Sequence, residues 1–288
     1  MINFLITGAN SCLSKNFSKY LKTNFPEEAL VIGTNRNGND QDDFDKVYKA
    51  DFFKKDFEKI NEKFDYVFHV ASAVPNKYQK KEDFYSINLE GSLEFFKKLK
   101  LKKNSTIMNI SSMSVYEKSN EKKIFENSQK CINDHYGRSK LLFERELNKL
   151  FRNSEISVLS LRVPCLLVPN VDGNFIAKMV EKIKNNEKVI LSNIDSKFNA
   201  AIDGNSLIEF VLNFKYNSKK EAFNMASEEK ITILEMAKTL SRLLGKDLDF
   251  DEVKSNFPSQ ILKTNKAEEF GFKPPSLENV LYNYILNQ

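Results

Sequence analysis

The chain has 288 residues, of which 41% are hydrophobic and 29% are charged, and a formal net charge of +5. This balance is typical of a globular protein with a sizeable core and excludes disordered chains, while the mixing of lysines with acids gives no reason to expect nucleic acid as a partner. Because the chain has no bilayer-length apolar run, leader-like start, paired cysteines or histidine cluster, we expect a cytoplasmic protein without membrane contact, disulfide or metal.

The first predicted elements are a buried strand at 2–6 and a helix that continues through Leu21, joined by the turn TGANSCLS. A strand, a tight turn and a helix in this order direct the first N–H groups of the helix at a phosphate. The dinucleotide-binding fingerprint has glycine at three places of such a turn; here Gly8 holds the first, and Ser11 and Ser14 hold the others. The expected cofactor contacts of this turn are Gly8, Asn10, Ser11, Cys12 and Leu13.

The second predicted strand, 30–34, is followed by Asn35 and Arg36. A site for NAD usually has an acidic residue near this strand end, which accepts a hydrogen bond from the ribose 2′-hydroxyl, whereas a 2′-phosphate favours a cation. The pair therefore favours NADP(H) over NAD(H) as the cofactor. The alternative is that Arg36 is only an exposed loop residue.

The next predicted elements are a short strand at 47–52, a helix at 54–62 and an apolar run at 66–73. Small residues at the end of this run allow a cofactor to pass close to the edge of a parallel sheet. We expect cofactor contacts there from Val70, Ala71 and Ser72. His69 lies inside the run and is expected to be a packed histidine rather than a catalytic one.

A tyrosine and a lysine begin a later helix. The elements in this part of the chain are predicted at 83–101 (helix), 106–110 (strand) and 137–151 (helix). Tyr136 and Lys140 stand one helical turn apart, so the ammonium can lie near the phenol and favour its ionised form, which would bring proton exchange nearer to neutral pH. Ser112 follows the strand and can hold the same reacting oxygen; Ser111 and Ser114 are the alternatives.

Strands alternate with helices of about a dozen residues through a strand at 157–161, which predicts an α/β fold with a doubly wound parallel sheet. The pattern then changes and predicts a smaller C-terminal α/β lid. The expected domains are a dinucleotide-binding domain at 1–167, to which 203–227 returns, and a substrate-binding region at 168–202 and 228–288. Further helices are predicted at 174–185, 206–214, 232–244 and 276–286, and strands at 189–191, 199–202 and 222–226. Ligands of such sheets bind at the carboxyl ends of the strands, so we expect a site between lid and sheet.

In these residues the chain resembles the extended short-chain dehydrogenases/reductases that modify nucleotide sugars, the NAD-dependent epimerase/dehydratase family. The resemblance covers nearly the whole chain and is carried by TGANSCLS, Asp51-Phe52, HVAS from His69, NLEGS from Asn88, SSMSVY from Ser111, Tyr136-x-x-x-Lys140, Leu161-Arg162 with Pro169, FNMAS from Phe223, TNKA from Thr264 and GFKP from Gly271. It implies a Rossmann sheet, an NAD(P)-dependent enzyme with a small-molecule substrate, and a homodimer through the helices that carry Asn88 and Tyr136.

The resemblance also implies roles for single residues. Tyr136 would be the proton donor or acceptor, Lys140 would hold the nicotinamide ribose and lower the pKa of the phenol, and Ser112 would bind the reacting oxygen. Further cofactor contacts implied are Asp51, Phe52, Asn88, Tyr136, Lys140 and Pro164. Substrate contacts implied are Val74, Ser112, Met113, Tyr136, Cys165 and Lys197.

The chain departs from the family pattern at several places. Two fingerprint glycines are serines, and Cys165 stands where many members have asparagine. Dehydratases carry an acid directly after the catalytic hydroxyl, where this chain has Met113, which argues against dehydration. The sequence therefore predicts an NADP(H)-dependent oxidoreductase of a nucleotide sugar, with 4-keto reduction favoured. Epimerisation with a retained cofactor is the first alternative, and a non-catalytic dinucleotide sensor is the second.

Overall fold

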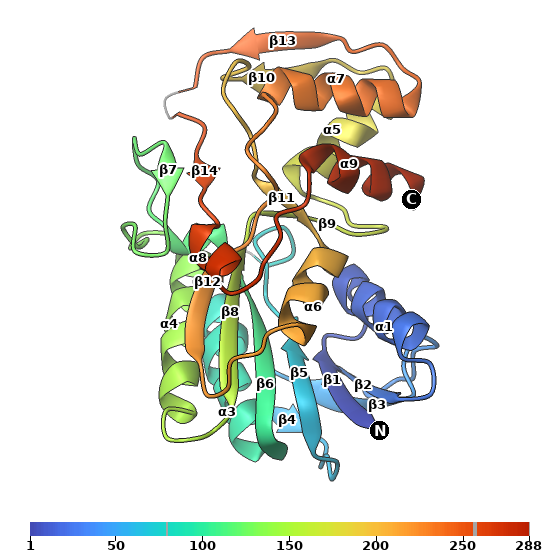
Figure 1. The fold of residues 1–288 in the computed structure, drawn as a ribbon, viewed down its shortest axis with the longest axis vertical. Coiled ribbons are helices and arrows are strands. Elements are labelled where there is room, and N and C mark those ends of the chain that lie inside the picture. The colour runs from blue at the N-terminus through green and yellow to red at the C-terminus, as the bar shows by residue number, and fades with distance from the viewer. Residues whose placement is uncertain (79, 256–257, 288) are drawn as a thin grey trace. The chain divides into compact units, whose positions relative to one another are not determined.

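The computed structural model describes residues 1–78, 80–255 and 258–287 of the chain. They form two compact units, each assembled from segments that are distant in sequence (Figure 1). The first unit contains Met1–Val115, Lys130–Arg162 and Val211–Phe223, and the second contains Tyr116–Gln129, Val163–Phe210 and the chain from Asn224 onwards. The segment 116–129, predicted to belong to the dinucleotide-binding domain, groups with the second unit because part of it pairs with a strand near the C-terminus.

The first unit is built on a large, mostly parallel sheet. Among the described strands its order is β12-β8-β6-β5-β1-β2-β3-β4. The strands are β1 (Ile2–Thr7), β2 (Ala29–Asn35), β3 (Lys46–Asp51), β4 (Asp56–Phe57), β5 (Phe64–His69), β6 (Leu101–Ser112), β8 (Ser157–Val163) and β12 (Lys220–Asn224). Parallel pairing brings the carboxyl ends of β1, β2, β3, β5 and β6 to one edge of the sheet. The predicted α/β fold class is confirmed.

Helices cover both faces of this sheet (Figure 1). On one face, the ring of Phe17 from α1 (Cys12–Asn24) lies 5.6 Å from that of Phe68 on β5. On the other face, α3 (Ser92–Lys98) and α4 (His135–Leu150) pack against strand residues that alternate with the first set. This second core includes Leu5, Val67, Phe95, Phe96, Ile107, Phe143 and Leu147. Because helices bury both faces of the sheet, the sequences of its central strands are almost continuously apolar.

The helix predicted at 54–62 is wrong. The Asp51 carboxylate accepts hydrogen bonds from the backbone N–H groups of Phe53 and Lys54 at 3.0 Å each, and Lys55 takes a left-handed φ of 55°. These contacts turn the chain back, so that β4 pairs antiparallel with β3. The apolar spacing that predicted a helix instead comes from side chains such as Phe57, whose ring lies 5.7 Å from that of Phe52.

The helix predicted at 83–101 is one helical segment with a wider turn in its middle. It consists of α2 (Lys81–Tyr85), a π-helical turn η1 (Ser86–Gly91) and α3. At Gly91 an added Cβ would lie 1.9 Å from the Phe52 carbonyl oxygen, so glycine lets this segment approach the end of β3 closely. Wider turns of this kind are frequent where a helix meets a functional site.

The second unit consists of small parallel sheets and helices. Its elements are β7 (Lys123–Ile124), β9 (Cys165–Leu167), α5 (Phe175–Lys184), β10 (Val189–Ser192), β11 (Ala201–Asp203), α7 (Ile233–Leu244), β13 (Phe250–Val253), β14 (Ile261–Leu262), α8 (Asn265–Glu269) and α9 (Leu277–Leu286). The described strands pair as β10 with β13, β11 with β9 and β14 with β7. Both β12 and α6 (Gly204–Leu212) have residues in each unit. Apolar residues of α5, α7 and α9 form one core, while β7, β9, β13, β14 and α8 were not predicted because they are short.

We expect Gly91→Ala to destabilise the protein by about 2–3 kcal/mol, because the new methyl group would overlap a backbone carbonyl that cannot move without displacing β3. Urea unfolding measures this change. The matched control is Glu90→Ala, whose side chain is exposed and forms an ion pair with Lys55; its free energy of unfolding should change by less than about 0.5 kcal/mol. Equal stability of Gly91→Ala and the wild type would contradict the close approach.

Candidate active site

Serines close the turn between β1 and α1. Gly8 has a left-handed φ of 75°, and an added Cβ would lie 3.2 Å from the Ala71 backbone, so glycine is needed there. The Ser11 hydroxyl caps α1 by accepting a hydrogen bond from the Ser14 N–H at 3.2 Å. Ser14 is buried, and its hydroxyl donates to the Thr7 carbonyl at 3.1 Å. The serines that stand in place of glycine therefore join helix to strand and leave the turn intact.

A buried hydrogen-bond chain connects this turn to the helix behind it. The Thr7 hydroxyl oxygen accepts from the N–H groups of Val70 and Ala71 at 3.0 Å each and lies 3.0 Å from His69 Nδ1. On the other side of the ring, His69 Nε2 lies 3.0 Å from the hydroxyl of Ser92, which itself donates to a carbonyl of η1. Thr7 therefore donates to Nδ1, and Nε2–H donates to Ser92. His69 is a packed, neutral histidine.

A cavity of about 410 Å³ lies at the carboxyl ends of β2 and β3. Arg36 lines it and donates from Nη2 to the Tyr78 hydroxyl at 2.8 Å. Asn35 does not face the cavity as a free amide: it donates to Asn10 Oδ1 at 3.1 Å and accepts from the Gly38 N–H at 2.7 Å. The remaining lining residues are Asn37, Lys49, Asp51, Phe53, Lys54, Asp56, Asp83 and Ile87. Cationic and acidic side chains thus share this cavity.

Asn88 fastens the end of β5 to two helices. Its side-chain oxygen accepts from the Ala73 N–H at 2.7 Å and from the Ser72 hydroxyl at 3.0 Å. Its amide donates to the Ala73 carbonyl at 3.1 Å and to the Ser139 hydroxyl on α4 at 3.1 Å. All four bonds are made by a side chain that is 2% exposed. Asn88 therefore fixes the distance between η1 and α4.

The start of α4 lies against the turn that follows β6. At Gly137 an added Cβ would lie 1.8 Å from the carbonyl oxygen of Ser114, in the 3₁₀ turn η2 (Met113–Val115). This approach brings Tyr136 near Ser112, whose hydroxyl acts to lower the pKa of the phenol. The Ser112 oxygen accepts from the Ser114 N–H at 3.1 Å, which leaves its hydroxyl proton to be donated to the phenolic oxygen.

The ammonium of Lys140 is buried one turn further along α4. It donates to the Ile110 carbonyl oxygen at 2.7 Å, and the side chain is 3% exposed. Burial lowers the pKa of Lys140 to about 8, and the nearby Glu144 acts in the opposite direction. Burial raises the pKa of Tyr136 to about 12, against the Ser112 hydrogen bond, with Asp134 adding to the rise. The predicted lowering of the phenol pKa by Lys140 is therefore wrong for this arrangement, because burial outweighs the other influences on the phenol.

The remaining predicted site residues lie in various places. Cys12 and Leu13 form the first turn of α1, Phe52 is in the core of the first unit, and Val74 and Met113 are half-buried. Pro164, Cys165 and Lys197 belong to the second unit. There Cys165 pairs with Ala201 across β9 and β11, burial raises the pKa of its thiol to about 12, and the Lys197 ammonium donates to the Lys230 carbonyl.

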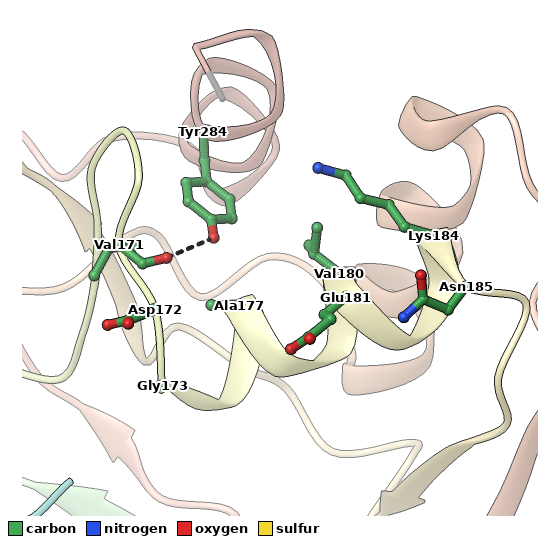
Figure 2. Close-up of a pocket in the computed structure, with 9 residues that line it drawn as sticks. All are labelled: Val171, Asp172, Gly173, Ala177, Val180, Glu181, Lys184, Asn185 and Tyr284. Carbon is green, nitrogen blue, oxygen red and sulfur yellow. Dashed lines mark hydrogen bonds between the residues drawn. The ribbon is translucent and has the colours of Figure 1, made fainter.

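A second cavity, of about 400 Å³, lies within the second unit between α5, α9 and the loop before α5 (Figure 2). The Tyr284 hydroxyl donates to the Val171 carbonyl at 3.2 Å across it, and Asp172, Glu181 and Lys184 lie around it. None of the residues predicted for the site lines this cavity. Its charged groups of both signs are solvent-exposed and give no defined chemistry.

Among residues 1–78, 80–255 and 258–287, no group of three or more His, Cys, Asp or Glu side chains could hold a metal ion. In the same part of the chain, no helix is both long and apolar enough to cross a membrane.

The structure adds residues that the sequence analysis did not single out. Tyr78 reaches Arg36 from a loop that carries no motif, and no sequence signal would have placed it there. Glu144 is different, because it follows Lys140 by one helical turn, and the same spacing argument that paired Tyr136 with Lys140 would have found it.

Comparison with protein families matches residues 4–212 to the NAD dependent epimerase/dehydratase family. Comparison with curated proteins finds no match. Among solved structures, the chain is similar to UDP-glucuronic acid 4-epimerase from Bacillus cereus in complex with NAD, with 18% identity, a TM-score of 0.81, and coverage of 99% of this chain and 96% of that one. It is equally similar to UDP-N-acetylglucosamine 4-epimerase from Methanobrevibacter ruminantium M1 in complex with UDP-N-acetylmuramic acid (18%, TM-score 0.81, 99% and 97%). A third is UDP-glucose 4-epimerase from Thermotoga maritima with UDP-glucose (18%, TM-score 0.77, 99% and 98%).

We expect His69 to make stability depend on pH. Burial, together with the Lys140 charge, lowers its pKa from 6.5 to about 3. Below pH 6.5, the unfolded chain therefore binds a proton at this histidine that the folded chain does not. The free energy of unfolding is unaffected by His69 ionisation above pH 6.5, and it falls by about 1.4 kcal/mol per pH unit between pH 6.5 and the folded pKa. Urea unfolding of His69→Gln should lack this slope, while the control His135→Gln, which changes a helix-start residue, should keep it. A wild-type and a His69→Gln protein with the same slope between pH 6.5 and 4.5 would contradict the assignment.

Proposed function

The chain belongs to the NAD dependent epimerase/dehydratase family, and on this premise we propose that it is a nicotinamide-dependent oxidoreductase that reduces the 4-keto group of a nucleotide sugar. The observation that carries the proposal is the close approach of α4 to the turn after β6, which groups Tyr136 with Ser112 and Lys140 and leaves the phenol protonated at neutral pH. A neutral phenol is a proton donor at neutral pH, as reduction of a ketone requires.

Tyr136, Ser112 and Lys140 would have different roles in protonating the reacting oxygen. Tyr136 delivers a proton to the carbonyl oxygen as it becomes a hydroxyl. Ser112 is oriented by the Ser114 N–H and stabilises the phenolate by donating to it once the proton has left. Lys140 supplies a positive charge on the same helix face, which also favours the phenolate after transfer. Met113, adjacent to Ser112, has no acidic group with which to eliminate water.

The first unit has the features that a nicotinamide dinucleotide needs. The Gly8 turn leaves no room for a Cβ, α1 begins at the end of β1, and a 410 Å³ cavity with Arg36, Asp51 and Tyr78 lies where β2 and β3 end. When bound, the dinucleotide supplies the hydride chemistry. The Gly8 turn would hold its pyrophosphate, and Arg36 its adenosine end; because Arg36 is a cation and Asn35 is not an acid, we propose a preference for NADP(H).

Epimerisation at C4 is the second candidate. It is favoured by the three similar structures, each of which carries the name of a nucleotide-sugar 4-epimerase, one of them in complex with NAD. The same Ser112, Tyr136 and Lys140 would serve it, with Tyr136 first accepting a proton. A cofactor that remains bound through purification and no net NADPH consumption would favour this candidate. A homodimer through α4 and the helical segment of α2, η1 and α3 that carries Asn88 is part of either proposal.

We expect Tyr136→Phe to lower kcat for reduction of a nucleotide 4-keto sugar by about 10²–10⁴-fold, because no proton donor then faces the carbonyl oxygen. The measurement is the loss of NADPH absorbance on addition of the keto sugar. Binding of NADPH, followed by fluorescence, should change little. The control Tyr85→Phe removes the hydroxyl that lies 3.2 Å from His135 on the surface and should leave kcat unchanged. A Tyr136→Phe protein as active as an active wild type would contradict Tyr136 as the proton donor, whereas a wild type without turnover would favour the sensor.

A separate substitution tests the cofactor preference. Arg36→Ser should weaken binding of NADPH by about tenfold or more while NADH binding changes little, because only the 2′-phosphate gains from the cation. Calorimetry with both cofactors measures the ratio. Lys54→Ser is the matched control, since it removes a cation from the same cavity but not the one at the end of β2. Equal losses for the two cofactors in Arg36→Ser would contradict the NADP(H) preference.

A further inference from the structure

The buried carboxylate of Glu144 is held from two strands. Arg162 on β8 grips it with two hydrogen bonds, from Nε at 3.1 Å and from Nη2 at 2.7 Å. The Ser111 hydroxyl on β6 donates to the same carboxylate at 2.5 Å. The side chains of Arg162 and Glu144 are 6% and 5% exposed. A buried pair of this geometry is costly to desolvate and is weak evidence for stability alone, so its placement calls for another explanation.

The carboxylate is linked to the groups proposed for catalysis through α4 and through the end of β6. Glu144 follows Lys140 by one turn of α4, so both side chains are on the same helix face. Ser111, which binds the carboxylate, lies between Ile110, whose carbonyl accepts from the Lys140 ammonium, and Ser112, which binds Tyr136. One carboxylate therefore fixes the strand end that positions the lysine and the catalytic hydroxyl.

Glu144 is the charged group that opposes the effect of burial on the Lys140 pKa. Of the charged and titratable groups that interact with Lys140, Glu144 lies on its own helix and His69 lies on β5, while Arg162 on β8 binds Glu144. His69, with a pKa of about 3, is uncharged near neutral pH. Without the carboxylate, Lys140 and Arg162 would be two buried cations that lack this shared counter-ion.

We propose that Glu144 is a positioning residue of the catalytic centre: clamped by Arg162 and Ser111, it keeps the Lys140 ammonium charged in the working pH range. The inference rests on the proposed function, in which the lysine charge stabilises the phenolate. Glu144 touches neither substrate nor cofactor in this role. It acts by raising the pH up to which Lys140 keeps its charge, and by holding the end of β6 at residues 110–112 in place.

The test is a direct titration of Lys140 that needs no substrate. Protein with ¹³C-labelled lysine is followed by NMR from pH 6 to 10, and the Lys140 signal is assigned from its absence in Lys140→Arg. The wild-type midpoint should lie near 8. In Glu144→Gln it should fall by about one pH unit or more, because an opposite charge at this range shifts a pKa by about 1–3 units. Glu144→Asp, which keeps the charge but retracts it, should give a midpoint between the two.

The matched control is Glu146→Gln, on the same helix, where the carboxylate contacts exposed Lys149 at 2.6 Å; its midpoint should equal that of the wild type. An unchanged midpoint in Glu144→Gln overturns the proposal, and if that variant does not fold, an unchanged midpoint in Glu144→Asp does so. The pH above which kcat declines should shift together with the titration midpoint of Lys140. If the NMR midpoint falls while the activity limit stays, the counter-ion role stands and the proposed use of Lys140 in catalysis fails.

Discussion

The candidate site depends on one close approach, between the start of α4 and the turn after β6. Gly137 allows it, because any side chain at that position would overlap the Ser114 carbonyl oxygen. With the backbones this close, Tyr136 meets Ser112, and Lys140 one turn later reaches the Ile110 carbonyl. Gly91 brings η1 to β3 in the same way, and Asn88 on that segment binds both the β5 loop and α4. The position of α4 is therefore set from two sides.

Burial at this contact decides the proton chemistry. A phenol beside an ammonium would be expected to lose its proton more easily, yet desolvation raises the pKa of Tyr136 and lowers that of Lys140. Both shifts favour the neutral forms of the two groups. A neutral phenol suits proton donation, and a lysine with a pKa near 8 needs its counter-ion in Glu144 to remain charged. The same low-dielectric surroundings keep His69 neutral, so that it serves as a connection between Thr7 and Ser92.

Much of the fold could be predicted because strand and helix periods are strong in long elements: the α1, α4 and α7 segments and the central strands all follow from apolar spacing. The helix at 54–62 was wrong because the chain there forms a hairpin with its loop at residues 52–55, held by Asp51, and so short a hairpin gives no helical or strand period. At the candidate site, Ser112, Tyr136 and Lys140 could be singled out from spacing and resemblance, and their catalytic roles remain predictions. Tyr78 could not, because its contact with Arg36 depends on loop conformation. The direction of the Tyr136 pKa shift depends on burial, which residue spacing does not show.

In the proposed reaction, hydride would pass from NADPH to C4 of a nucleotide 4-keto sugar while Tyr136 protonates the oxygen. The most direct measurement uses NADPH deuterated at its transferable position, with NMR of the sugar product after complete turnover. We expect deuterium at C4 and one equivalent of NADPH consumed per product. Unlabelled product formed without net NADPH consumption, or no reaction with any nucleotide 4-keto sugar, would contradict it.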